Sequence, residues 1–201
     1  ARDAADMKNM KQIALAVFNY ESVHRRFPAD VVDDQGNPLL SWRVELLPYL
    51  EEGRLYEQIR RDEPWNSDHN RQVLAAMPMV FQSNANPSAP GTTCFLGLKG
   101  PGTIWENGGG VRLREVTDGT SNTVMIVRAD PDAAVEWAKP GDLPFDPQLP
   151  RSSLNGGPRG LVVGMCDGSV FPLAQWVTDE TIRNLATKAG GEVIDYSTFR
   201  D

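Results

Sequence analysis

The first two dozen residues constrain the fold most, because their side chains follow the period of an α-helix. From Asp3 to about His24, the apolar side chains fall within an arc of roughly 160° when successive residues are placed 100° apart. Polar residues occupy the other side, with Leu15 as the main apolar exception. Pro28 lacks an amide hydrogen and restrains Phe27, so the helix has to end before it. A stripe this wide predicts a helix that can lie along a sheet. Its members are Met7, Met10, Ile13, Ala14, Val17, Phe18 and Tyr20.

The start of the chain is unusual for a complete protein. It has no initiator methionine, and Ala1 already lies inside the helical pattern. No stretch approaches the roughly 20 apolar residues that a membrane span requires. We therefore expect the native helix to be longer, with a targeting or anchoring segment upstream of Ala1.

Short helices are expected in the next part of the chain. Ser41 can cap a helix that runs through Trp42 to Leu50, and Pro48 predicts a break or kink within it. Further helical turns are expected through Leu55 and Ile59 and over Val73 to Met77, on either side of a polar connection, 60–70.

Strands and loops are expected after Pro78. The loops fall at 83–92, where Asn, Pro, Ser and Gly follow one another closely, and in the glycine-rich run 100–110. Thr93 to Leu98 is predicted as a short strand, and Asn122 to Val127 as a longer one that is rich in β-branched residues.

Residues 161–173 have the pattern of a buried β-hairpin, because two apolar runs flank the dipeptide Asp167-Gly168. This dipeptide suits a type I′ turn, in which both central residues have positive φ. With such a turn, Gly164 would lie opposite Phe171.

The remaining C-terminal segments are a proline-rich excursion and a helix. Residues 129–158 carry six prolines and are expected to form an extended excursion with one short strand near Val135 to Trp137. The last helix is expected from Asp179 to Ala189, with Thr178 as N-cap and Gly190 as C-cap.

Composition limits the function classes. A chain of 201 residues, 40% hydrophobic and 23% charged, fits one soluble domain that spans 1–201. The net charge is −7 and there is no dense run of Lys or Arg, which argues against nucleic-acid binding and against adsorption to an anionic membrane. Lys99 and Arg112 are expected to be solvated surface charges. Cys94 and Cys166 could form one bridge, but two buried thiols are the expected state.

The sequence offers little for catalysis. Its two histidines are His24, at the end of the first helix, and His69, in a polar loop, and no nucleophile-elbow, zinc-protease or phosphate-loop motif is present. A triad could still assemble from distant positions, so a hydrolase remains an alternative. We assign no catalytic, metal or cofactor-binding residue and expect no cofactor.

Two loops are candidate interaction sites. Residues 62–70 gather acids, amides and a histidine around Trp65, with Asp68 and His69 as possible ligands for a cation or a sugar. The other interpretation, which we favour, is a loop whose polar side chains bond their own backbone while Trp65 covers an edge of the core.

In the second loop, 116–123, Asp118 and Asn122 could help to coordinate Ca²⁺. One such loop cannot supply the six to eight oxygens that Ca²⁺ takes, so we favour an Asx-type turn here.

Five segments, in this order, together resemble a large family of prepilin-type proteins of unknown function from planctomycete bacteria. The resemblance covers nearly the whole chain. The matching segments are Ala1-Arg2-Asp3-Ala4-Ala5 with residues 9–16, 19–20 and 27–28; Ser41-Trp42-Arg43-Val44 with 46–51; Asp62-Glu63-Pro64-Trp65 with His69-Asn70; 117–123; and Asp167-Gly168-Ser169-Val170.

The chain departs from the family pattern at three places. Gly157 stands where the family usually has a histidine. Residues 82–84 replace a Cys-Pro-Ser, and the strand after 117–123 ends in Arg128 where the family often has Glu.

The resemblance implies a prepilin-type leader and an apolar helix before Ala1, so that residues 1–26 are the C-terminal half of the native helix. The implied fold is α+β and pilin-like: a long N-terminal helix packed on an antiparallel sheet, with short additional helices and long loops. The implied function is that of a pseudopilin-like assembly subunit of a type II secretion or type IV pilus-like system.

Its expected partners are other pilin-like subunits or itself. The full-length protein would be anchored to the inner membrane and exposed in the extracytoplasmic envelope. The alternative is an envelope module that binds carbohydrate or another ligand, suggested by Trp65 and by Trp105 and Trp137 in loop-rich regions.

Overall fold

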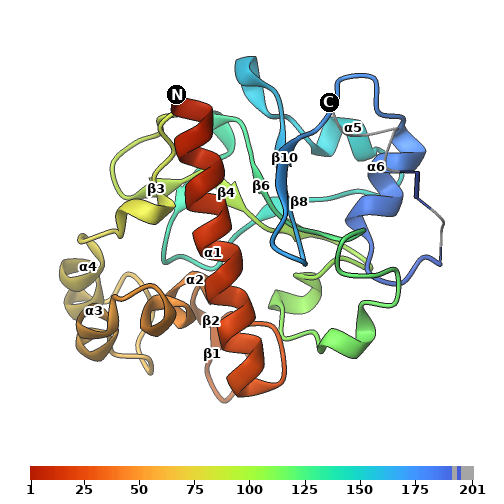
Figure 1. Cartoon of the computed structure of the whole chain (residues 1–201). Helices are drawn as coiled ribbons and strands as arrows, with labels where there is room; N and C mark the ends of the chain where they lie inside the picture. The colour runs from red at the N-terminus through yellow and green to blue at the C-terminus, as the bar shows by residue number, and fades with distance from the viewer. Residues whose placement is uncertain (192–193, 196–201) are drawn as a thin grey trace.

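A computed structural model describes residues 1–191, 194 and 195. At its centre is a four-stranded sheet in the order β10-β9-β6-β4, with every neighbouring pair antiparallel (Figure 1). Strands β6 and β9 are buried along their whole length, as apolar side chains on both faces require. The strands are β4 (Phe95–Leu96), β6 (Val124–Arg128), β9 (Val162–Met165) and β10 (Val170–Pro172).

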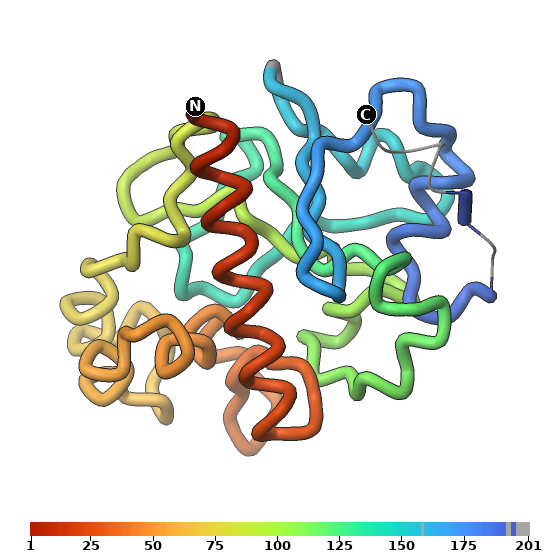
Figure 2. Tube along the Cα trace, viewed as in Figure 1, coloured from red at the N-terminus to blue at the C-terminus, as the bar shows by residue number. Residues whose placement is uncertain are grey.

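Helix α1 (Arg2–His24) lies against β9 and β10 on one face of this sheet, which confirms the predicted helix and its position (Figures 1 and 2). Met10, Ile13 and Val17 on its inner side are fully buried. The helix ends at Arg25, which adopts a left-handed conformation with φ 59° and donates its amide to the Glu21 carbonyl at 2.7 Å. None of the helices among residues 1–191 is long and apolar enough to cross a membrane.

The described residues form two hydrophobic cores, and α1 packs into the first of them. Helix α6 (Asp179–Ala186) packs into the second core, together with buried side chains of β4, β6 and β9 that do not belong to the first. As predicted, the Thr178 side chain caps it by accepting from the Thr181 amide at 3.1 Å. It stops at Ala186, so the predicted extension to Ala189 and the cap at Gly190 are wrong. The reason is that Lys188 donates its amide to the Gly102 carbonyl at 2.9 Å, which draws the chain out of the helix.

Short elements complete the fold. Three two-stranded sheets pair β1 with β2, β3 with β7, and, in parallel, β5 with β8. These strands are β1 (Val31–Val32), β2 (Pro38–Leu40), β3 (Thr92–Thr93), β5 (Leu98–Lys99), β7 (Val135–Glu136) and β8 (Leu143–Pro144). The short helices are α2 (Trp42–Glu45), α3 (Gly53–Gln58), α4 (Asp68–Leu74) and α5 (Pro150–Ser153), and the 3₁₀ turns are η1 (Leu47–Tyr49), η2 (Met79–Phe81), η3 (Glu106–Gly108), η4 (Leu113–Glu115), η5 (Pro131–Ala133) and η6 (Gly157–Arg159). The α+β class predicted from the sequence is confirmed.

The helices predicted between residues 41 and 77 are present, but the last of them was predicted at the wrong place. Ser41 caps α2, and the chain passes into the 3₁₀ turn η1 at Pro48, as expected. Helix α4 starts at Asp68 and ends at Leu74, so the predicted bounds of 73–77 are wrong. It starts early because the Ser67 side chain accepts from the Asn70 amide at 3.1 Å and forms an N-cap.

The predicted strand from Thr93 to Leu98 is divided into parts of three sheets. Side chains interrupt the ladder, because the Thr93 hydroxyl accepts from the Phe95 amide and the Asp142 carboxylate accepts from the Gly97 amide at 2.7 Å. The predicted strand over 122–127 is confirmed with a shift of two residues at its start, at Val124.

The hairpin of β9 and β10 is confirmed, but its predicted turn and register are wrong. Gly164 lies opposite Val170, and Phe171 opposite Val163. Asp167 does not have positive φ, whereas Gly168 has φ 85°. The Gly168 amide donates to the Met165 carbonyl at 3.0 Å, which gives a three-residue loop with glycine in the left-handed position. That one extra loop residue shifts the register.

The proline-rich segment 129–158 lies against both cores. Its predicted strand is present as β7, and the segment also supplies β8 and α5. Trp137 and Phe145 are buried, one in each core. Trp137 donates its ring nitrogen to the Leu74 carbonyl at 2.9 Å, which joins this segment to α4.

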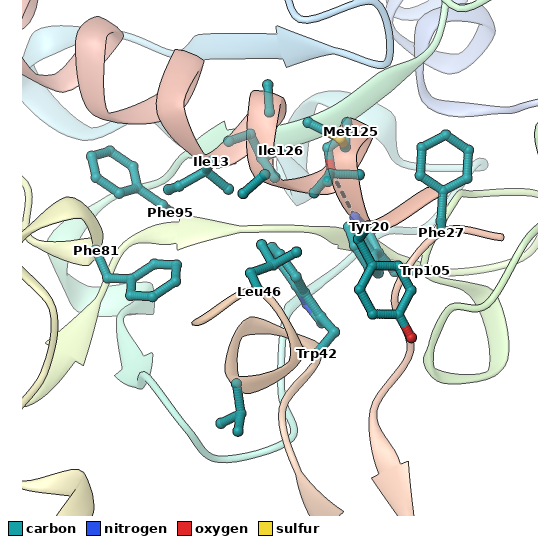
Figure 3. Packing of buried hydrophobic residues seen from close by; sticks show 14 of the residues in the cluster. Ile13, Tyr20, Phe27, Trp42, Leu46, Phe81, Phe95, Trp105, Met125 and Ile126 are labelled. Carbon is teal, nitrogen blue, oxygen red and sulfur yellow. Dashed lines mark hydrogen bonds between the residues drawn. The ribbon is translucent and has the colours of Figure 1, made fainter. Parts of the chain in front are cut away.

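Two stacked tryptophans lie in the same buried core as the inner side of α1 and part of β6. The rings of Trp42 and Trp105 have centroids 4.1 Å apart and are inclined by 18°. Trp105 donates its ring nitrogen to the Met125 carbonyl of β6 at 2.6 Å, drawn as a dashed line in Figure 3. Gly97 lies directly against the Trp105 ring, and a Cβ atom at Gly97 would overlap it.

This contact predicts that Gly97→Ala destabilises the protein by ~1–3 kcal/mol, because the fixed Trp105 ring cannot move aside. Gly53→Ala is the matched control, since no atom lies within 4 Å of the added Cβ there. Urea unfolding of both variants checks the prediction. Equal stability of Gly97→Ala and the wild type would contradict it.

Candidate functional site

A buried ion pair joins helix α1 to the central strand β6. Asp6 and Arg128 are both fully buried, and Arg128 Nη1 lies 3.2 Å from Asp6 Oδ2 and 2.6 Å from Asp3 Oδ1. The hydrogen bond from Arg128 holds the pKa of Asp3 below its usual range. The other end nitrogen, Nη2, donates to the carbonyls of Arg159 and Gly160, next to β9.

The same Asp6 carboxylate also holds the segment after η2. It accepts from the Ser83 hydroxyl at 2.5 Å and from the amides of Asn84 and Ala85 at 2.6 and 3.2 Å. Two of the places where the chain departs from the prepilin-type pattern, 82–84 and Arg128, therefore meet at one carboxylate. The sequence analysis missed Asp6, although it lies four residues before Met10 on the apolar stripe, a position where an acid has to be paired.

The third departure, Gly157, has a local backbone reason. Its φ is 67°, which favours glycine, and a Cβ atom there would lie 2.7 Å from Asp130 Oδ2.

A second buried ion pair joins α2 to the proline-rich segment. Arg43 Nη2 lies 2.6 Å from Asp142 Oδ1, and both side chains are almost completely buried. The other Asp142 oxygen accepts from the ring nitrogen of Trp42 at 2.9 Å, while Arg43 donates to the Phe95 carbonyl of β4. The Ser41-Trp42-Arg43 segment thus fixes three parts of the chain to one another.

Asp30 lies beside this pair and differs from an ordinary surface acid. Burial raises its pKa to about 6, with a further contribution from the negative charge of Asp142, although the Trp42 amide donates to it at 2.9 Å. Asp30 therefore changes its charge near pH 6.

The structure does not gather Trp65, Asp68 and His69, the residues of the first candidate loop, into one site. Trp65 is half-buried against the core, and Lys139 Nζ lies 5.3 Å from the centre of its ring. Asp68 is exposed in the first turn of α4, and a His69 ring nitrogen lies 2.8 Å from the Gln58 carbonyl. A cavity of about 150 Å³ adjoins Trp65, and Arg71, Glu136 and Trp137 contribute to its lining.

The buried residue of this loop is Asn70, which the sequence analysis did not single out. Its Oδ1 accepts from the Arg60 amide at 2.9 Å. Its Nδ2 donates to the carbonyls of Arg60, Glu63 and Pro64. Asn70 thereby holds the loop in shape, which agrees with the interpretation that its polar side chains bond their own backbone.

The predicted pair of Asp118 and Asn122 also makes backbone contacts. Asp118 accepts from the amides of Gly190 and Gly191 at 2.6 and 2.7 Å, which fixes the chain after α6. Asn122 donates to the Asp118 carbonyl at 2.9 Å. In the described part of the chain, no three His, Cys, Asp or Glu side chains gather as metal ligands would.

The two histidines lie apart and have separate partners. His24 stacks on Tyr20, with ring centroids 4.0 Å apart, and its Nε2 lies 3.1 Å from the Tyr49 hydroxyl. Cys94 and Cys166 are buried and not bonded to each other, as expected. Burial raises the pKa of the Cys94 thiol to about 11, so this thiol is unreactive at neutral pH.

A comparison with known protein families finds a match in the N-terminal half of the chain. Residues 1–100 match the model of a family described as "Protein of unknown function (DUF1559)". The DUF1559 match covers α1, the Arg43 segment and the Asn70 loop, whereas Asp118 and the Asp167-Gly168 loop lie beyond it. Neither the curated proteins nor the solved structures gave a match.

The raised pKa of Asp30 predicts a pH-dependent stability with a definite sign. An unfolded Asp has a pKa of ~3.9, so between about pH 4 and 6 the folded chain binds the extra proton and this contribution to stability falls as pH rises. Asp30→Asn removes the charge but keeps an acceptor for the Trp42 amide. It should therefore be more stable than the wild type at pH 7.5, by up to ~2–3 kcal/mol for a pKa that rises from ~3.9 to about 6 on folding, and gain little at pH 4.

Urea unfolding at both pH values measures this difference, with exposed Asp34→Asn as the control. A stability difference between Asp30→Asn and the wild type that is the same at pH 4 and pH 7.5 would contradict the assignment.

Proposed function

We propose that the chain is the extracytoplasmic part of a pseudopilin-like subunit, which works by assembly in a type II secretion or type IV pilus-like system. The observation that carries this proposal is the position of α1, a 23-residue helix laid on an antiparallel sheet. The prepilin-type sequence pattern of the chain supports it. In this proposal, an apolar segment upstream of Ala1 anchors the protein in the inner membrane.

The outer side of α1 supports a role in subunit contacts. Leu15 and Val23 point away from the core and are 62% and 65% exposed. Leu15 borders a hollow of about 260 Å³ whose lining includes Leu50 and Val80. An exposed apolar side chain beside a partly apolar hollow is a suitable contact for another pilin-like subunit, or for a second copy of the chain.

The proposal gives the chain no catalytic role. The motif residues Arg43, Asn70 and Asp118 are all engaged in contacts that hold the chain itself together. Such residues support a rigid head whose surface, rather than its chemistry, does the work.

The alternative function, an envelope carbohydrate-binding module, has weaker support. Trp105 and Trp137 are 1% and 2% exposed, so neither can serve as a platform for a sugar ring. Trp65 retains part of its surface beside a cavity, but Lys139 lies over its ring.

The assembly proposal predicts proximity of subunits at Leu15 in the native membrane. A full-length Leu15→Cys protein, treated in cells with a short thiol cross-linker, should form adducts with itself or with another pilin-like subunit. Glu180→Cys is the matched control, since Glu180 is exposed on α6, which belongs to the other core. The native Cys94 and Cys166 should stay unreactive because both are buried.

Immunoblotting and mass spectrometry of the membrane fraction identify the adducts. Recovery of the full-length protein outside the membrane fraction, or adducts equally abundant at positions 15 and 180, would contradict the proposal.

A further inference from the structure

A hollow lined by arginine lies at the C-terminal end of α1. Its volume is about 540 Å³, which is larger than that of the cavity beside Trp65. Two segments far apart in the sequence form it, one at the end of α1 and one at η4. The lining residues are Glu21, His24, Arg25, Arg26, Arg112, Leu113 and Arg114.

Backbone hydrogen bonds fix these two segments side by side. The Phe27 amide donates to the Val111 carbonyl at 2.7 Å, and the Gly110 amide donates to the Pro28 carbonyl at 3.1 Å. One step further on, the Asp30 amide donates to the Gly108 carbonyl at 2.8 Å. The two backbone segments that carry these arginines are therefore held side by side by the fold.

Arginine side chains outnumber acidic side chains in the lining of this hollow. The guanidinium groups of Arg25, Arg26, Arg112 and Arg114 form none of the ion pairs found among the described residues, whereas most of those pairs engage other arginines. Glu21 is the one acid in the lining, and the nearby Glu115 carboxylate accepts from the Arg112 amide. The hollow is therefore a local positive patch on a chain of net charge −7, and such a patch attracts anions.

Stabilisation of the helix end does not account for all four arginines. His24 and Arg25 lie in the last turn and at the C-cap of α1, where cations complement the helix dipole. Arg112 and Arg114 come from another segment and face the same hollow. Guanidinium groups bind phosphate and sulfate through paired N–H donors, so a hollow lined by four arginines suits an oxyanion ligand.

We propose that this hollow binds a compact ligand with several phosphate or sulfate groups. Its position argues against a membrane lipid as the source, because its lining includes His24 and Arg25. These residues lie at the opposite end of α1 from Ala1, which is the end marked N in Figure 1. This last step rests on the proposed function, which puts the membrane at the Ala1 end. The binding itself does not depend on that function.

Calorimetric titration of the chain with sodium tripolyphosphate, at an ionic strength of about 20 mM, tests the proposal. Arg25→Gln/Arg114→Gln removes one arginine from each segment and should weaken binding at least ~10-fold. Lys8→Gln/Arg54→Gln is the matched control, because it removes the same charge from exposed positions outside the hollow and should weaken binding less than ~3-fold. Circular dichroism confirms that both variants are folded.

Three results would overturn the proposal. They are no heat of binding with the wild type, equal weakening in the two double variants, and binding to phosphatidylglycerol vesicles without binding to tripolyphosphate. Either of the first two results would mean that the hollow is not an anion-binding site. The third would mean that the hollow binds a membrane surface and not a compact anion. None of them bears on the cross-linking of subunits at Leu15, so the two proposals fail independently.

Discussion

The structure depends on the buried ion pair between Asp6 of α1 and Arg128 of β6. A buried charge without a partner is costly, so the helix has to lie where Asp6 can reach Arg128. The pair therefore selects one position of α1 along the sheet, which apolar contacts alone would specify less sharply. Because Asp6 also binds the backbone of residues 84 and 85, the same contact fixes the segment that leads into the central sheet.

Much of the remaining chain is held by side chains that bond distant backbone groups. Many strands have two residues, too few to order the loops through ladders. Arg43 and Asp142 join α2 to β4 and the proline-rich segment, and Asn70 closes the loop before α4. Asp118 holds the chain after α6. These residues explain how a loop-rich chain is held in one fold.

The sequence predicted the features whose signals are local. The apolar stripe identified α1, and Ser41 and Thr178 identified two helix starts, because an N-cap acts within three residues. The hairpin was found from its flanking apolar runs, but its register depended on whether Asp167 has positive φ, which a dipeptide does not determine. Trp65, Asp68 and His69 were grouped by sequence proximity, and the fold gives them separate environments.

The features that the sequence did not reveal depend on long-range contacts. Asp6 and Arg128 are 122 residues apart, and the two arginine segments of the hollow approach through a backbone ladder between 27–30 and 108–111. An overall charge of −7 concealed this local positive patch.

A double-mutant cycle on Asp6 and Arg128 tests the central claim most directly. The free energy of unfolding would be measured for the wild type, Asp6→Asn, Arg128→Met and the double variant. Arg128→Met should cost ~3–5 kcal/mol, because it leaves the buried Asp6 carboxylate without its charged partner. Asp6→Asn should cost less, because Arg128 keeps its ion pair with Asp3. The double variant should lose at least ~1 kcal/mol less stability than the two single losses added together. Additive effects, or single losses below ~1 kcal/mol, would contradict the claim that this pair fixes α1 on the sheet.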